Sequence, residues 1–345
     1  MNNKGIALIL VLLVILLLMV IVFEFSFAMK VEITATRNFK DETDCYFYAQ
    51  SGFQQAVAEI IKGHVFRDEE ETTGEVSPWR DDQRKIEMEI GHGKAEVMIS
   101  NERGKYDINT VPEDLLRNLI ATLGVEERER DIIVDSIMDW KDDDNLHRIN
   151  GAEDDYYESL SDPYHSKDGP FDTVEELLLV RGITPALLYG FFVNPKGEEK
   201  PFRQKGLVDL VTVYTRSFQV DANSAPQEVL MSIPGMTEEK ADQIIEAREE
   251  KPLKNLNSLG PQVGDQAFTQ ALIKYLAISP SMVYTIISTG SIPESGAMRR
   301  VKGVVKINLT GKEKFQVLYW VDNYPIAENL ISPEVNFRGK GREPS

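Results

Sequence analysis

The sequence predicts an α+β protein, in which a long N-terminal transmembrane helix precedes a small antiparallel sheet and a large helical insertion interrupts that sheet. Three observations predict this class: an uncharged apolar run near the N-terminus, alternating apolar runs in two separate places, and a repeated helix-start motif between them. A chain of 345 residues has room for about two domains. We divide it into a short leader, a membrane helix, a stem with the first strands, the insertion, and the last strands with a tail, at residues 1–5, 6–28, 29–104, 105–276 and 277–345.

The charge balance narrows the classes of partner. There are 56 acidic and 38 basic side chains, and the net charge of −18 opposes broad attraction to nucleic acid or anionic lipid. Cys45 is the single cysteine, which excludes an internal disulfide and any metal site that needs two thiolates. The four histidines are too scattered for a zinc cluster. Proteins or cations are the expected partners.

The first element is a membrane-spanning helix. The nineteen residues from Gly5 to Phe23 contain no charge, and at ~1.5 Å per residue they nearly cross ~30 Å of hydrocarbon. A cleaved secretory signal is the alternative, but its apolar core is usually ~7–15 residues, whereas here apolar residues continue to Met29. Basic residues flank the run on both sides, so the positive-inside rule does not settle the orientation.

The helix is expected to continue beyond Lys30 as an amphipathic stem and to stop at Gly63. Apolar residues recur there at spacings of three and four, which predicts one face packed on a soluble domain. That face comprises Ile33, Cys45, Tyr48, Ala49, Phe53, Ala56, Val57, Ile60 and Ile61.

Alternating runs predict the strands of the sheet. Residues 85–90 and 95–99 flank Gly91-His92-Gly93 and form an expected hairpin. After residue 105 the pattern turns helical until about Leu276, and strands resume at 283–287, 300–307 and 315–320, the last two joined by a turn at 310–313. The tail from Gly339 to Ser345 is expected to be disordered.

Inside the insertion a motif repeats. Residues 107–116 and 221–230 share an Asp-x-Asn-(Thr/Ser)-x-Pro start, in which the hydroxyl of Thr110 or Ser224 is expected to cap the helix and the proline to occupy its first turn. A glycine-containing turn and a second helix follow each copy, and a third turn lies at 180–185. These units resemble helix-hairpin-helix motifs.

Helix-hairpin-helix units often bind DNA through backbone N–H groups at a Gly-hydrophobe-Gly turn. Here the third turn position is Glu126, Thr184 or Thr237 instead of glycine, and paired glutamates open two of the second helices. Carboxylates would repel a phosphate at that place. We therefore expect structural helix pairing and no nucleic-acid binding.

An acidic segment is the candidate chemical site. Between Asp139 and Glu158 there are eight acidic residues and two strong bases, a cluster that a hard cation would neutralise, and calcium accepts ~6–8 oxygen ligands. The segment is not an EF-hand, because Leu146 and His147 occupy places that need an oxygen ligand and a glycine. A solvated acidic loop without metal is the alternative; no nucleophile or phosphate-binding loop accompanies the acids, so no enzymatic role is expected. The candidate calcium ligands are Asp139, Asp142, Asp144, Glu153 and Asp154.

The short leader and the long helix resemble the type IV pilin family. That resemblance implies cleavage by a prepilin peptidase between Gly5 and Ile6. Most pilins carry Glu at the fifth mature position, where this chain has Leu10, and among type II secretion pseudopilins that absence marks the K-type minor pseudopilin. The ordered motifs at 102–110, 139–144, 151–157 and 221–226 are similar to the same family along nearly the whole chain, with Ser224 where Thr is more usual.

The resemblance implies a pilin-like sheet with a large insertion and calcium in the acidic region. It also implies a place at the pseudopilus tip with the I- and J-type minor pseudopilins, insertion in the inner membrane, and a soluble part in the periplasm. Two alternatives are a minor pilin of a type IV pilus system and a membrane-tethered DNA-uptake protein.

Overall fold

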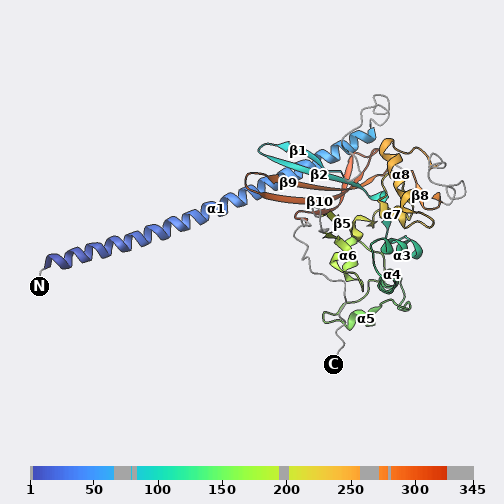
Figure 1. Ribbon diagram of the computed structural model, residues 1–345, viewed down its shortest axis with the longest axis horizontal. Coiled ribbons are helices and arrows are strands. Elements are labelled where there is room, and N and C mark those ends of the chain that lie inside the picture. Colours follow the sequence, from blue (N-terminus) through green and yellow to red (C-terminus); the bar gives the residue numbers. More distant parts are fainter. Residues whose placement is uncertain are drawn as a thin grey trace.

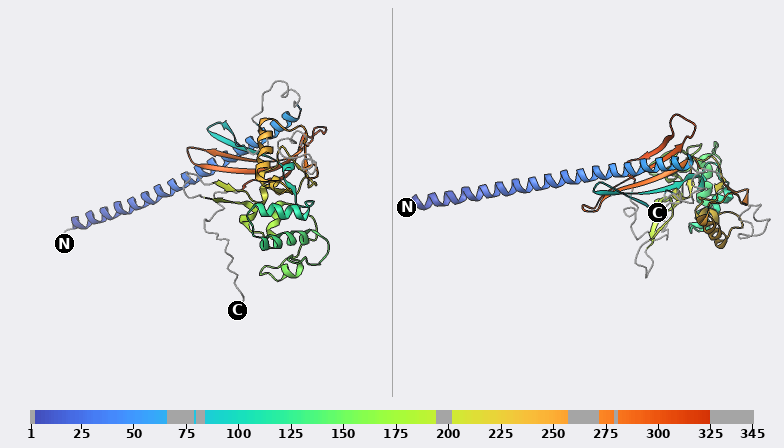
Figure 2. Two further views of the ribbon diagram at one scale, coloured as in Figure 1. Left: turned by 45° about the vertical axis from the view of Figure 1, so that its right-hand side comes forward. Right: turned by 90° about the horizontal axis from the view of Figure 1, so that it is seen from above.

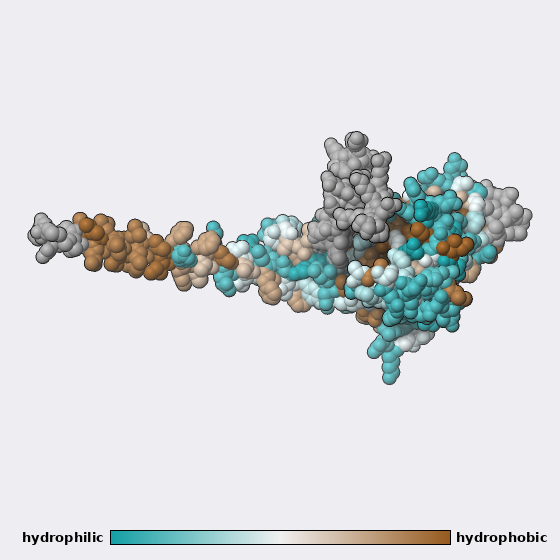
Figure 3. Space-filling model, turned by 90° about the horizontal axis from the view of Figure 1, so that it is seen from below, coloured by the Kyte–Doolittle hydropathy of each residue, from teal (hydrophilic) through white to brown (hydrophobic). Residues whose placement is uncertain are grey.

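The computed structural model describes residues 3–65, 79, 84–193, 202–256, 272–278 and 281–324. Its longest element is the single helix α1, Asn3–Val65, which ends two residues beyond the predicted stop. The N-terminal half of α1 projects away from the rest of the protein, and its C-terminal half lies across a sheet (Figures 1 and 2). Figure 3 shows that the projecting half is the most apolar part of the visible surface. Gly5 and Ile6 belong to the first turns of this helix.

The sheet has five strands in the order β1-β2-β9-β10-β11, and all four pairings are antiparallel. Every strand coincides with a predicted alternating run, although four of them extend further than the pattern indicated. The predicted hairpin around Gly91 and the turn before the last strand are both confirmed. The strands are β1 Ile86–Ile90, β2 Gly93–Asn101, β9 Val283–Ile292, β10 Ala297–Ile307 and β11 Phe315–Val321.

The stem packs on this sheet through the predicted face. Its fully or largely buried residues are Cys45, Ala49, Phe53, Ala56, Val57 and Ile60. Phe53 packs edge-to-face on Trp320 of β11, with ring centroids 4.8 Å apart. Ile33 was predicted to belong to this face but is 62% exposed, because the sheet covers α1 only from about Cys45 onward.

The insertion leaves and re-enters the sheet at one point. β2 ends at Asn101 and β9 begins at Val283, yet these strands are neighbours and Asn101 pairs with Tyr284. A buried ion pair marks the junction: Lys105 Nζ lies 2.6 Å from Glu102 Oε1, which also accepts a 2.8 Å hydrogen bond from the Thr285 hydroxyl. The two ends of the insertion therefore meet, so a long segment can be added without disturbing the strand order.

The insertion consists of short elements around its own core. Its helices stand in a column beside the sheet, with α5 at the end farthest from α1 (Figures 1 and 2). The α-helices are α3 Glu113–Thr122, α4 Glu127–Lys141, α5 Asp154–Glu158, α6 Pro185–Tyr189, α7 Gln227–Met231 and α8 Glu238–Glu250. The 3₁₀ segments are η1 Glu102–Gly104, η2 Val174–Leu179 and η3 Leu207–Asp209.

The expectation of a wholly helical pattern from 105 to 276 was wrong in one respect. Three two-stranded pairings interrupt it, because a pair of two or three residues is too short to show a period of two. They join β3 Tyr106–Asp107 with β6 Val211–Thr212, β4 Phe191–Val193 with β5 Phe202–Gln204, and β7 Val220–Asp221 with β8 Leu276–Ala277. The predicted disordered tail, 339–345, lies outside the described residues.

Candidate cation site and helical repeats

All three predicted turns of the repeats are present. Gly124, Gly182 and Gly235 have φ of +78°, +87° and +81°, a left-handed conformation that glycine adopts without steric cost. They join α3 to α4, η2 to α6, and α7 to α8. The third copy differs from an ordinary hairpin because its first helix is 3₁₀.

The predicted capping of the repeats was wrong. Pro112 and Pro226 are the N-cap residues, with extended ψ of 148° and 156°, and neither helix has a side-chain cap. The first amide bonds of these helices are accepted by the proline carbonyls, from Leu116 and Leu230. The Ser224 hydroxyl instead donates to Asp221.

The asparagine of each repeat forms two hydrogen bonds with the backbone of a distant loop. Asn109 donates to the carbonyl of Phe171 at 3.0 Å and accepts from its N–H at 2.8 Å. Asn223 makes the same pair of bonds with Leu253, at 3.1 and 2.7 Å. Both side chains therefore satisfy the backbone of a distant loop, which supports structural pairing as the role of the repeats.

The hairpins offer little to a phosphate. Thr184 and Thr237 accept from amides in the first turns of α6 and α8, which uses donors that an anion would need. The first turn of α4 contains Glu127 and that of α8 contains Glu238. Absence of nucleic-acid binding stays a prediction.

The acidic segment brings three predicted ligands together. Asp142 follows the end of α4, Asp144 lies two residues on, and Glu153 is the N-cap of α5. One carboxylate oxygen from each lies within 4.8 Å of the others. The chain between them forms a loop, residues 142–153, which we call the acidic loop. A single cation could contact all three carboxylates.

The environment of Glu153 fits a cation. Its side chain is buried, and within the described chain neither carboxylate oxygen has a hydrogen-bond partner; Asp142 Oδ1 is in the same condition. Burial, together with the charges of Asp139, Asp142, Asp168 and Asp144, raises the pKa of Glu153 to about 7. Buried carboxylates are ordinarily paired or bound to metal, so this arrangement suits a hard cation such as calcium.

The other two predicted ligands are not members of that group of three, although the charge of Asp139 acts on Glu153. Asp139 is fully buried and accepts from the backbone N–H of Arg148 at 3.3 Å. Asp154 belongs to a second, more exposed group with Glu158 and His165, and it accepts from Ser166 at 2.8 Å. The Ser166 N–H lowers the pKa of Asp154, which keeps it ionised without a cation.

Sequence reasoning missed Asp168. This residue comes from a separate loop, has φ of +51°, accepts from the Ser166 hydroxyl at 2.6 Å, and contributes to the raised pKa of Glu153. The following Gly169 makes an Asp-Gly pair, which indicates a turn. Nothing in the sequence linked that turn to Glu153, because their proximity depends on how the loop folds back.

The architecture defines a pilin-like protein: a long apolar helix continues into a stem that packs on an antiparallel sheet, with a large insertion between the neighbouring strands β2 and β9. The family model described as "Type II secretion system (T2SS), protein K" matches residues 98–189, and that for "Helix-hairpin-helix motif" matches 216–272. In residues 98–189 the chain is therefore similar to protein K of type II secretion systems.

One relative extends this similarity over most of the chain. The chain is 24% identical to type II secretion system protein K of Pseudomonas aeruginosa over 80% of this chain and 83% of that one. It is 27% identical to the protein K of Pectobacterium carotovorum subsp. carotovorum, over 36% of this chain, and 34% identical to that of Klebsiella pneumoniae, over 25%. These two matches span only 44% and 27% of the relatives' lengths.

The fold is similar to a chain in the crystal structure of the GspK-GspI-GspJ complex from enterotoxigenic Escherichia coli. The TM-score is 0.58 at 17% identity, over 83% of this chain and 98% of that one. This likeness confirms the fold class.

Proposed function

We propose that this protein is a minor pseudopilin that caps the tip of the type II secretion pseudopilus, with a structural role in protein export and no enzymatic activity. The observation that carries the proposal is the joint presence of a pilin-like helix and a protein K insertion in one chain. The I- and J-type minor pseudopilins are its proposed partners, since the solved complex of similar fold contains GspI and GspJ with GspK. Neither a type IV pilus role nor DNA uptake is favoured by the relatives found.

The proposed location follows from α1. Its apolar part has a mean hydropathy of 3.4 over its most apolar window and is not covered by any other described part of the chain. Such a helix can anchor the protein in a membrane. We place it in the inner membrane as a single span, with the soluble part in the periplasm, after prepilin peptidase cleaves between Gly5 and Ile6.

Leu10 gives a physical reason for tip placement. In a pilin filament the mature amine of one subunit lies in an apolar core, where an unpaired charge is costly, and a neighbouring glutamate offsets it. A subunit with leucine at that position offers no such partner. It is therefore tolerated where no further subunit needs the charge, which is the end of the filament.

Immunogold labelling of overproduced pseudopili tests this proposal. We expect wild-type protein at one end only, and Leu10→Glu protein at the end and along the shaft, because the new carboxylate restores the missing partner. Intact mass should show that both proteins begin at Ile6. Wild-type label along the shaft would contradict the tip role.

We propose that Asp142, Asp144 and Glu153 bind a calcium ion. The supporting observation is that the Glu153 carboxylate is buried and has no hydrogen-bond partner in the described chain. Calcium titration of the full chain in detergent should show heat of binding that is lost when Asp142 and Asp144 become Asn. Asp143→Asn is the matched control, because Asp143 is an exposed acid of the same loop outside the group of three. Equal loss in the control would mean that net charge, and not a defined site, attracts the ion.

A further inference from the structure

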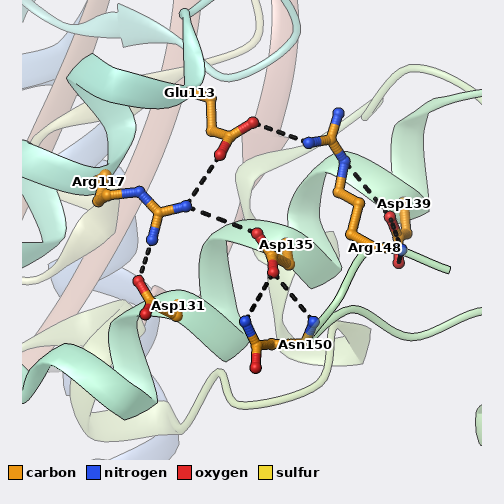
Figure 4. A network of polar contacts seen from close by, with 7 residues as sticks. All are labelled: Glu113, Arg117, Asp131, Asp135, Asp139, Arg148 and Asn150. Atoms are coloured by element: carbon orange, nitrogen blue, oxygen red, sulfur yellow. Dashed lines mark hydrogen bonds and ion pairs between the residues drawn. The ribbon is translucent and has the colours of Figure 1, made fainter.

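Two residues of the acidic loop form hydrogen bonds with α4, and both lie between the proposed calcium ligands in the sequence. Asp135 and Asp139 are four residues apart on α4 and so lie on one helix face. Figure 4 shows Asn150 directed at Asp135, whose Oδ2 accepts from the Asn150 backbone N–H at 3.1 Å and from its side-chain Nδ2 at 3.0 Å. The Arg148 N–H donates in the same way to Asp139.

Asp135 is also held by an ion pair with the neighbouring helix α3. Arg117 of α3 approaches Asp135 Oδ1 at 3.6 Å, donates to Glu113 at 2.9 Å, and also pairs with Asp131. Asp135 is only 7% exposed, and the Arg117 guanidinium compensates its charge and holds its carboxylate in place. The acceptor for Asn150 is therefore immobilised by both helices of the first hairpin.

The second contact, between Arg148 and Asp139, brings the backbone of the acidic loop close to α4. The Arg148 guanidinium joins Glu113 at 2.8 Å and Asp139 at 3.5 Å (Figure 4). At Gly151 a Cβ atom would lie 1.8 Å from Asp139 Oδ2, so only glycine permits this approach. The middle of the loop is thus fixed by contacts that use none of the three proposed ligands.

We propose that Asn150 and its acceptor Asp135 are positioning residues that set the calcium affinity, by holding the acidic loop against α4 before the ion arrives. Asp142 and Asp144 begin this loop and Glu153 ends it, so their separation depends on the path of the residues between them. A loop that is already closed loses less conformational freedom on binding. This inference rests on the calcium site proposed above.

Asn150→Ala is the cleanest test because it changes no charge. Substitution of Arg148 would mix the loss of a contact with the loss of a positive charge beside the acids. Asn145→Ala is the matched control: Asn145 is an exposed asparagine of the same loop, and no hydrogen bond of its side chain is found among the described residues. In the full chain in detergent we expect Asn150→Ala to weaken calcium binding about fivefold to tenfold, the effect of one hydrogen bond, and Asn145→Ala to leave it unchanged.

A double-mutant cycle separates positioning from general damage. Asp135→Ala removes the acceptor of the Asn150 side chain from the helix side, and its other effects, including the change of charge, enter both arms of the cycle and cancel. The two substitutions combined should therefore weaken calcium binding by less than the product of their separate effects. Hydrogen exchange in chelator should show protected amides in residues 148–151 of the wild type and of Asn145→Ala, and faster exchange in Asn150→Ala.

The outcomes discriminate between the two proposals. Independent effects in the cycle, or wild-type affinity in Asn150→Ala, would overturn the positioning role while the calcium site stands. A wild type that binds no calcium would overturn both. Neither result would bear on the pseudopilus tip, which the labelling experiment tests separately.

Discussion

The stem with its sheet and the insertion are stabilised in different ways. The first has a 63-residue helix and strands of up to 11 residues, and its buried cluster is built from apolar side chains such as Phe53, Val97 and Ile286. The insertion has several five-residue helices and also buries carboxylates, among them Asp107, Asp139 and Asp221.

The difference follows from element length. A short helix leaves most of its amides and carbonyls without partners inside the helix. Aspartate and asparagine side chains provide them: Asp107 accepts from the amides of Asn109, Thr215 and Arg216. An insertion of short elements is therefore rich in buried polar residues, and the carboxylate of one of them, Glu153, has no hydrogen-bond partner in the described chain.

The largest expected effect on stability comes from a substitution in the apolar cluster between the stem and the sheet. Phe53→Ala should lower the free energy of unfolding by about 3–5 kcal/mol, because it removes a fully buried ring and leaves a cavity beside Trp320. Denaturant unfolding of the full chain in detergent measures this. Phe47→Ala on the same helix is the control, since Phe47 is 55% exposed and should cost under about 0.5 kcal/mol.

The same variant sharpens the comparison. The insertion has a separate apolar cluster around Leu116, Ile137 and Leu177, so calcium affinity should be unchanged by Phe53→Ala. A parallel loss of calcium binding would show that the two halves fold as one unit.

A smaller effect is expected from pH, and it concerns the polar half alone. The folded-state pKa of Glu153, about 7, lies above its ordinary value of 4.5. In calcium-free protein this group's contribution to stability is complete below about pH 4.5 and is lost as the pH rises to about 7. Calcium needs the ionised form, so its affinity should rise about tenfold between pH 6 and pH 8.

Titration calorimetry at the two pH values checks this. Glu153→Gln, which cannot titrate, should lose the calcium heat and also flatten the pH dependence of the chelator-treated melting temperature. A calcium affinity equal at both pH values would remove Glu153 from the set of ligands.

The smallest effect is expected at the tip of the acidic loop. Ile149 is 98% exposed, so Ile149→Ser should change the free energy of unfolding by less than about 0.5 kcal/mol and leave calcium affinity unaltered. Thermal melting with and without calcium measures it. A loss above about 1 kcal/mol would show that apolar contact, and not the polar fastening to α4, holds this loop.

The sequence alone determined the long elements, whose structure follows from a local pattern of residues. Nineteen uncharged residues, the stem face from Cys45 to Ile60, and the alternating runs of all five strands were predictable because their periods repeat over many residues. The glycine turns at 124, 182 and 235 were equally visible.

Tertiary structure decided what depends on segments far apart in the chain. It placed Asn101 beside Tyr284, gave the two-residue strands their partners, and made Pro112 rather than Thr110 the N-cap residue of α3. It also divided the acids: of the five carboxylates that the sequence predicted as ligands, the fold paired Asp139 with Arg148 and brought Glu153 beside Asp142 and Asp144. Composition shows how many charges a segment contains, but only the path of the backbone determines which of them are close enough to share a cation.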